Sequence, residues 1–284
     1  MADNAIRAAL DHAAGASLTA AMQQYYELGN ESERLASSAQ GRLEFERTQE
    51  ILLRALPPAP ATVADIGGGP GRYALWLASL GYQVLHRDVM PLHVEQLREE
   101  AGPRSGIQSA IGDARNLDIP DASVDAVLLL GPLYHLERED ERVQALREAS
   151  RIVRPAGPVL GAAISRWSAR LDGVLRVRLY EEYPQVEQMV DRLERTGMIE
   201  PLFPGSFAAV THRPDELRQE VLAAGLEVTD LVGVEGVAFL LYDLEDRAAD
   251  SRAWRIVLDA ARAHERVPEL MGASPHLLVT ARRL

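Results

Sequence analysis

Asp65-Ile66-Gly67-Gly68-Gly69-Pro70-Gly71 is the stretch of this 284-residue chain that decides its fold. Residues 62–66 are short, apolar and partly β-branched, which predicts a buried strand. Residues 72–80 repeat apolar side chains at helical spacing, and Gly81 ends that pattern. A glycine turn between strand and helix lets the backbone approach a ligand closely, with the first helical amides facing it. The sequence therefore predicts a ligand site at this turn.

The alternation of strand and helix continues outward from the turn. Six further apolar runs predict strands: 82–85, 107–111, 124–130, 159–164, 228–234 and 276–281. Helical patterns with short links separate most of these runs, which is typical of a parallel sheet covered on both faces. The expected fold is α/β, a doubly wound, mostly parallel, seven-stranded Rossmann-like sheet.

Two helical segments stand outside this alternation. Residues 1–56 have helical spacing and end at the proline cluster 57–60, which predicts an N-terminal helical segment, called the cap below. Residues 166–207 follow the fifth strand and predict a helical insertion. The Rossmann-like core is then expected over 62–165 and 208–284.

Composition excludes several kinds of chemistry. The chain has 30 basic and 42 acidic side chains, a net charge of −12, with no cysteine and no lysine. Nucleic acids and membranes are therefore not expected as partners, because both need clustered positive charge. Thiolate metal sites, cysteine nucleophiles and lysine Schiff bases are excluded. Neither a signal peptide nor a membrane span is evident, so we expect a cytoplasmic protein.

The glycine turn also separates two cofactor families. The dinucleotide pattern G-x-G-x-x-G would need glycine at position 72, which is Arg72. The pattern D-x-G-x-G-x-G, with Gly67, Gly69 and Gly71, resembles that of class I S-adenosylmethionine-dependent methyltransferases of the bacterial small-molecule type. The resemblance implies a Rossmann-like fold, S-adenosylmethionine (SAM) as cofactor and S-adenosylhomocysteine (SAH) as product. It also implies that these glycines bind the cofactor.

Two later stretches follow the order of the same family. Asp88 ends the second strand, where the resemblance implies an acid that accepts hydrogen bonds from both ribose hydroxyls, with Val89 beside it. Residues 111–114 resemble the segment that holds the adenine edge, which assigns this role to Asp113 and Ala114.

A third stretch resembles the fourth motif of the family. In residues 125–136 the strand ends beside the methionine portion of the cofactor and the acceptor, which adds Leu130 to the implied cofactor residues. Residues 152–157 then match the family's turn before the fifth strand, apart from Ala156 and the following Pro158.

Residues 25–35 resemble the cap of many bacterial small-molecule members. The resemblance implies that Tyr26 and Arg34 hold the carboxylate of the cofactor, a task that suits the guanidinium fork. The alternative is that Arg34 pairs with Glu31 or Glu44 and only braces the cap.

Methyl transfer from a sulfonium mainly needs alignment of the acceptor and exclusion of water, so a base is required only if the acceptor must lose a proton. His135, just after the fourth strand, is the first candidate base, and His212, after the insertion, is the second. Tyr134 is a candidate for orienting the acceptor. For all three the alternative is a structural role. No metal-binding spacing is present, so no metal is expected.

Aromatic side chains are concentrated in the cap and the insertion, which together hold eight of the 15. If both segments fold over the methyl end of the cofactor, as a lid and an acceptor pocket, they line an aromatic cavity. The alternative is that these rings are helix–helix core. The candidate acceptor-binding residues are Tyr25, Trp167, Tyr180 and Phe207.

The favoured interpretation is a SAM-dependent methyltransferase of secondary metabolism, a monomer or homodimer. Its acceptor would be a small aromatic or apolar molecule, methylated at oxygen, nitrogen or an electron-rich ring carbon. Two alternatives stay open: an NAD-type oxidoreductase on a Rossmann fold, and a SAM-binding protein without catalysis. The sequence specifies neither the acceptor nor the need for a base.

Overall fold

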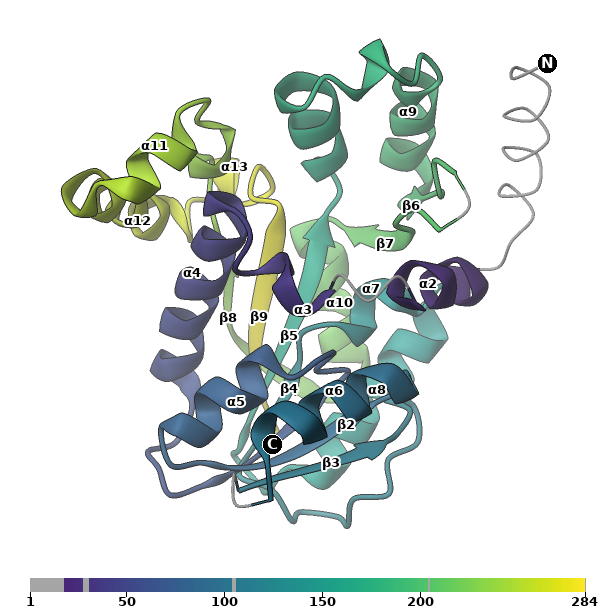
Figure 1. Ribbon diagram of the computed structural model, residues 1–284. Helices are drawn as coiled ribbons and strands as arrows, with labels where there is room; N and C mark the ends of the chain where they lie inside the picture. The colour runs from purple at the N-terminus through teal and green to yellow at the C-terminus, as the bar shows by residue number, and fades with distance from the viewer. Residues whose placement is uncertain (1–17, 28–30, 104–105, 204, 284) are drawn as a thin grey trace.

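The computed structural model describes residues 18–27, 31–103, 106–203 and 205–283 (Figure 1). Residues 1–17 and 28–30 of the predicted cap lie outside the described residues. No helix in the described ranges is long and apolar enough to cross a membrane.

A nine-stranded sheet forms the centre of the molecule, in the order β3-β2-β1-β4-β5-β7-β6, with β9 also pairing β5 and β8 pairing β9. The strands are β1 Thr62–Ile66, β2 Gln83–Asp88, β3 Ile107–Ile111, β4 Ala126–Leu129, β5 Pro158–Ser165, β6 Met198–Ile199, β7 Ala209–His212, β8 Leu226–Gly233 and β9 His276–Arg283. Strands β1 to β5 and β7 pair in parallel, whereas β6, β8 and β9 make antiparallel pairs. The predicted doubly wound, mostly parallel α/β class is confirmed.

The predicted number of seven strands was wrong. The two additional strands, β6 and β7, are only two and four residues long. β7 pairs with the last two residues of β5, Ile164 with Thr211 and Ser165 with His212. Such short strands carry no apolar alternation of their own, so only their tertiary pairing defines them.

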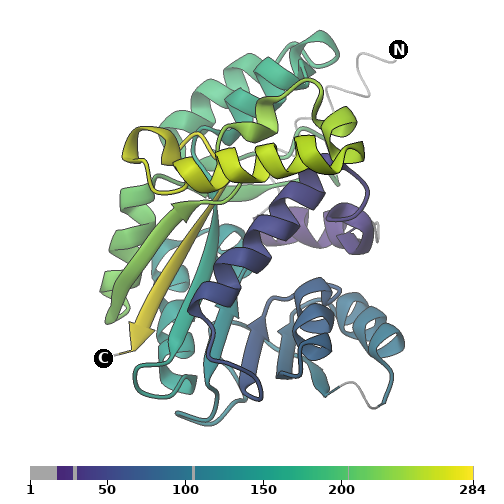
Figure 2. The same cartoon turned by 90° about the vertical axis from the view of Figure 1, so that its left-hand side faces the viewer.

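Helices cover both faces of the sheet (Figure 2). On one face α8 (Glu139–Ile152) and α10 (Pro214–Ala223) contribute buried Leu146 and Val221 to one apolar cluster. On the other face α4 (Ala39–Ala55), α5 (Arg72–Ser79) and α6 (Pro91–Ala101) contribute Leu52, Leu77 and Leu97 to a second cluster. The remaining helices are α2 Leu18–Glu27, α3 Glu31–Arg34, α7 Pro132–His135, η1 Arg170–Arg176, η2 Leu179–Glu181, α9 Val186–Thr196, η3 Ala238–Leu240, α11 Leu244–Ala249, α12 Ser251–His264 and α13 Pro268–Met271.

The insertion rises from the carboxyl end of β5, on the side where the parallel strands end (Figure 1). Its first part is a π-helical turn, η1, and a short 3₁₀ turn, η2, before Pro184. Its second part is the amphipathic helix α9, which ends at Gly197 in the left-handed conformation. The insertion was predicted to be helical, and only its second part is an α-helix.

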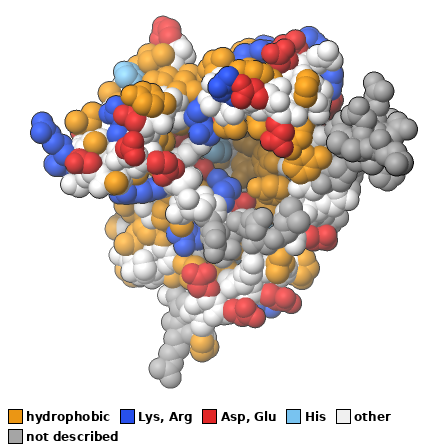
Figure 3. Space-filling model, turned by 45° about the horizontal axis from the view of Figure 1, so that its top comes forward, with side chains coloured by type: hydrophobic (Ala, Val, Ile, Leu, Met, Phe, Trp, Pro, Cys, Tyr) orange, Lys and Arg blue, Asp and Glu red, His pale blue; other side chains and the backbone are white. Residues whose placement is uncertain are grey.

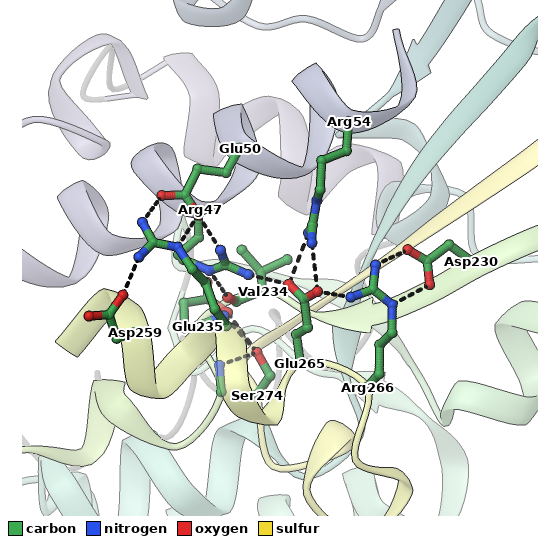
Figure 4. A network of polar contacts seen from close by, with 12 residues as sticks. Arg47, Glu50, Arg54, Asp230, Val234, Glu235, Asp259, Glu265, Arg266 and Ser274 are labelled. Atoms are coloured by element: carbon green, nitrogen blue, oxygen red, sulfur yellow. Dashed lines mark hydrogen bonds and ion pairs between the residues drawn. The ribbon is translucent and has the colours of Figure 1, made fainter. Parts of the chain in front are cut away.

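A buried arginine fastens the cap helix α4 to the C-terminal part of the core (Figure 4). The fully buried Arg47 donates to the carbonyl of Val234 at 3.2 Å and to the carboxylate of Glu265. Arg54, two helical turns further on, reaches the same carboxylate at 2.6 Å. This network holds α4 against the C-terminal part of the core.

Candidate functional site

A cavity of about 350 Å³ lies at the carboxyl ends of the parallel strands. Its walls include the residues that directly follow β1, β2, β3 and β4, and α2 and α3 cover it from the cap. Eleven of the predicted site residues line it: Tyr26, Arg34, Gly67, Gly69, Asp88, Val89, Asp113, Ala114, Leu130, Tyr134 and His135. The molecular surface on this side is hollowed, and hydrophobic side chains gather around the hollow (Figure 3).

The glycines of the turn have different tasks. Gly67 has a φ of +65°, and a Cβ there would lie 2.5 Å from the Cγ of Pro132, so the turn and the start of α7 approach closely. Gly71 has a φ of +87°, and a Cβ there would lie 2.4 Å from the side chain of Leu97. Unlike Gly67 and Gly69, Gly71 does not line the cavity. Its role in the structure is to let α5 pack against α6.

Asp88 lies at the end of β2, 5% exposed, and is held by three donors. Its Oδ2 accepts from the amide of Gly69 at 2.9 Å, and its Oδ1 accepts from the amide of Met90 at 2.8 Å and from Nδ1 of His93 at 3.1 Å. Burial would raise the pKa of the carboxyl, but these hydrogen bonds lower it below its usual value. The cavity therefore contains a fixed carboxylate that accepts hydrogen bonds.

Asp65, at the end of the adjacent strand β1, has a raised pKa, whereas that of Asp88 is lowered. It is fully buried below the glycine turn, and neither carboxylate oxygen has a hydrogen-bond partner among the described residues. Burial, with a smaller contribution from Asp88, raises its pKa to about 7. The aspartate of the glycine motif is thus a buried carboxyl group outside the cavity lining.

The predicted adenine-binding residues lie at the end of β3. The Asp113 carboxylate forms an ion pair with Arg115 at 2.6 Å, and Arg115 also pairs with Glu141. The hydrogen bond from Arg115 lowers the pKa of Asp113. Asp113 is therefore an ionised acceptor at this end of the cavity.

Two arginines line the cavity from α3 and from the start of α5. Arg34 donates to Glu31 at 2.7 Å and to both oxygens of Glu44 at 2.7 and 3.1 Å, so it braces the cap while lining the cavity. Arg72, the first residue of α5, makes no ion pair with the described residues, and its buried Nε lacks a partner there. Its guanidinium lies 5.4 Å from the ring centre of Phe45. Arg72 was not predicted to line the cavity, although its place directly after the glycine turn was a signal.

Aromatic rings from three segments meet at the α7 end of the cavity. Tyr26 of α2 bonds His135 Nε2 through its hydroxyl at 2.7 Å, and the Tyr134 ring lies 4.6 Å from that of His135. Phe207 approaches His135 at 6.0 Å and Tyr25 at 5.4 Å between ring centres. Phe207 and Tyr25 form a second layer, because they do not line the cavity themselves. Burial lowers the pKa of His135 to about 3, which keeps the ring neutral.

The structure places three other candidates away from this cavity. His212 is buried and lies 3.3 Å from Glu220, which also binds Arg142, beside a separate polar cavity of about 240 Å³. Trp167 stacks under Arg213 beside a third cavity. The hydroxyl of Tyr180 accepts from Arg178 at 3.3 Å. None of the three residues lies at the aromatic rings around His135 or lines the main cavity.

One cluster in the described part of the chain has the spacing of metal ligands: Glu44, Glu235 and His276, with ligand atoms within 4.8 Å of one another. Its atoms already have partners. His276 Nδ1 binds Glu235 at 2.6 Å, Ser274 donates to Glu235 at 2.8 Å, and Arg34 covers both oxygens of Glu44. The cluster is an ion-pair network between the cap and β9.

The sequence of this chain is similar to those of known methyltransferases. Residues 64–160 match the family model described as a methyltransferase domain. The chain is 28% identical to malonyl-[acyl-carrier protein] O-methyltransferase of Methylococcus capsulatus, over 48% of this chain and 52% of the relative. It is 29% identical to the mouse tRNA (carboxymethyluridine(34)-5-O)-methyltransferase, over 38% of this chain and 15% of the relative. The chain thus spans about half or less of these relatives.

A SAM-dependent methyltransferase from Methanosarcina mazei has a similar fold, with a TM-score of 0.55 at 17% identity over 82% of this chain and 97% of the other. The matched domain contains the glycine turn, Asp88 and Asp113, which line one cavity at the ends of parallel strands. These features together identify residues 64–160 as a methyltransferase domain of the class I S-adenosylmethionine-dependent type.

Proposed function

We propose that the protein transfers the methyl group of SAM to a small aromatic or apolar molecule of secondary metabolism. The observation that carries the proposal is the composition of the cavity. The glycine turn and the carboxylates of Asp88 and Asp113 line the same cavity as the rings of Tyr134 and His135. The polar groups suit the nucleoside, and the aromatic rings suit an apolar acceptor.

The residues of the cavity fit SAM, which supplies an activated methyl group when it is bound. Asp88 is ionised and has free acceptor capacity for the ribose hydroxyls. Asp113 and the amide of Ala114 would hold the adenine edge. Arg72 is the better candidate for the carboxylate of the methionine portion, because Arg34 already has two carboxylate partners.

The surroundings of His135 favour an orienting role over that of a base. Its pKa of about 3 makes it a weak proton acceptor at neutral pH, and its Nε2 is already bonded to Tyr26. Tyr26, Tyr134 and His135 would align the acceptor and exclude water. This favours an acceptor that is already nucleophilic at oxygen, nitrogen or a ring carbon.

The charges around the cavity support a small acceptor over a nucleic acid. Five carboxylates line the cavity: Glu31, Asp88, Asp113, Glu137 and Glu141. Of the arginines there, Arg34 and Arg115 are paired with carboxylates. Phosphate backbones need unpaired positive charge, which this surface lacks apart from Arg72.

Calorimetric titration with SAM, SAH and NAD tests the cofactor. We expect SAM and SAH to bind at micromolar strength and Asp88→Ala to weaken both by about 100-fold, because two hydrogen bonds to a carboxylate are lost. Asp140→Ala, an exposed carboxylate outside the cavity, is the control and should bind like the wild type. Binding of NAD alone would refute the proposal.

Methyl transfer is tested next with tritiated SAM and a panel of phenols, amines and enolisable acids. Labelled product with one of these classes supports the proposed reaction and identifies the acceptor atom. Tight SAM binding without transfer to any panel member would favour a SAM-binding protein that does not catalyse methyl transfer.

A further inference from the structure

His93 is a buried histidine beside the cofactor cavity, and neither the family resemblance nor the proposed function gives it a task. It is the third residue of α6, it is 3% exposed, and its side chain is among those that line the cavity. Pro91 begins α6 three residues after Asp88, so the first helical turn brings His93 back to the Asp88 carboxylate.

The hydrogen bond between the two residues determines which ring nitrogen carries the proton. Asp88 is an ionised carboxylate and can only accept, so Nδ1 of His93 must donate across the 3.1 Å contact. In a neutral imidazole the other nitrogen, Nε2, is then a bare acceptor. This nitrogen is buried and has no donor among the described residues.

A buried acceptor without a donor is uncommon in folded proteins and often marks the place of a ligand. In the structure the ring of Tyr26 lies edge-on against His93, with 5.0 Å between ring centres. Tyr26 belongs to α2 of the cap, which covers the cavity. His93 and Tyr26 therefore lie side by side in the wall of the cavity.

We propose that His93 is a positioning residue for the cofactor, and that it acts with Asp88 as one unit. Its Nδ1–H holds the Asp88 carboxylate in place, and its Nε2 accepts a hydrogen bond from a ribose hydroxyl of SAM. This proposal rests on the proposed function, because it requires SAM as the cofactor. It assigns the ribose two acceptor atoms: Oδ2 of Asp88, which accepts only from Gly69 among the described residues, and Nε2 of His93.

Two variants separate the two contacts of His93. His93→Asn retains an N–H group near the place of Nδ1 but lacks an atom at Nε2, whereas His93→Leu lacks both groups. We expect the affinity for SAH, measured by calorimetry, to fall about fivefold in His93→Asn and at least tenfold in His93→Leu. His264→Asn on α12, outside the cavity, is the matched control and should bind SAH like the wild type.

SAH analogues without the 2′- or the 3′-hydroxyl identify the partner of Nε2. For the analogue that lacks this hydroxyl, His93→Asn and the wild type should differ less than twofold, because the contact is already absent. If His93→Asn binds SAH like the wild type, or loses the same factor with SAH and with both analogues, the proposal is wrong. Failure of the wild type to bind SAH would instead refute the proposed cofactor.

A measurement on the wild-type protein does not depend on whether the variants fold. Nitrogen-15 NMR of the histidine rings should show His93 with a protonated Nδ1 and a bare Nε2 in the free protein. The Nε2 resonance should shift when SAH is added and should not shift with the analogue that lacks the relevant hydroxyl. A protonated Nε2 with a bare Nδ1, or no shift with SAH, would overturn the proposal.

Discussion

Two neighbouring carboxyl groups, at the ends of β1 and β2, differ in their pKa although both are buried. Asp88 has three donors and stays ionised, whereas Asp65 has no partner among the described residues and has a pKa of about 7. The difference arises from the backbone, because the amides of Gly69 and Met90 point at Asp88. At the residue scale, hydrogen bonding and not burial alone decides which of the two can bind a ligand.

Asp65→Asn should change the pH dependence of stability. The pKa of Asp65 is raised from 3.8 to about 7 on folding, so its contribution is present at low pH and is lost as the pH rises through about 7. The asparagine side chain does not ionise, so the variant does not lose this stability as the pH rises. Its free energy of unfolding relative to the wild type should therefore increase by roughly 2–3 kcal/mol from pH 5 to pH 8.

Urea unfolding at the two pH values measures this difference. Asp140→Asn, at an exposed carboxylate, is the control. Its free energy of unfolding relative to the wild type should change by less than about 0.5 kcal/mol between the two pH values. The same difference between Asp65→Asn and the wild type at both pH values would show that Asp65 does not titrate in this range.

Arg72→Met should weaken SAH binding about tenfold, because a charge-assisted hydrogen bond to the ligand carboxylate is lost. Methylthioadenosine, which has the nucleoside but no carboxylate, should bind the variant and the wild type equally. Calorimetry with both ligands separates this role from general packing. A similar loss for both ligands would place Arg72 in the structural support of α5.

At the scale of elements, the position of α4 depends on a buried ion pair. Arg47 is surrounded by the carbonyl of Val234 and the carboxylate of Glu265, which connects the cap helix to the loop after α12 (Figure 4). The same helix carries Glu44, which holds Arg34 at the cavity. Displacement of α4 would therefore alter the site as well as the core.

Arg47→Met should lower the free energy of unfolding by roughly 3 kcal/mol, because it removes one partner of a buried pair while the Glu265 charge remains. Arg54 still binds Glu265 in this variant, which limits the loss. Urea denaturation measures the change. Arg138→Met removes a highly exposed pair with Asp140 and should cost less than about 1 kcal/mol. Equal effects of the two substitutions would contradict the bracing role.

At the scale of the whole molecule, the cap and the insertion meet above the sheet. Arg176 of η1 donates to Gln40 of α4 at 2.8 Å, and the rings of Tyr25 and Phe207 touch. Segments far apart in the sequence thus enclose the α7 end of the cavity. The chain as a whole has a net charge of −12, which disfavours association with polyanions.

Transfer RNA should not bind. With fluorescently labelled unmodified tRNA at about 50 mM salt, we expect no saturable change in anisotropy up to about 20 µM protein, since phosphate binding needs unpaired basic side chains. A micromolar dissociation constant that weakens steeply with salt would contradict this expectation and direct the acceptor search to RNA.

Local patterns in the sequence were sufficient for the strand–turn–helix unit around Gly67 and for the doubly wound class, and the family resemblance singled out Asp88 and Asp113, which line the cavity. The turn and the alternation of strand and helix are visible in the spacing of apolar residues and glycines along the chain. The two short strands β6 and β7 could not be predicted, because only pairing with β5 and with each other defines them.

Only the tertiary structure decided which side chains share the cavity. Arg34 acquired its carboxylate partners, His212 came to lie beside Glu220 in another cavity, and Trp167 and Tyr180 were placed away from His135. The sequence by itself determined most of the elements and the class of site, since backbone conformation largely follows local side-chain chemistry. The partners of each charged or aromatic group depend on contacts between distant segments, which hydrophobic burial and electrostatics settle only in the folded chain.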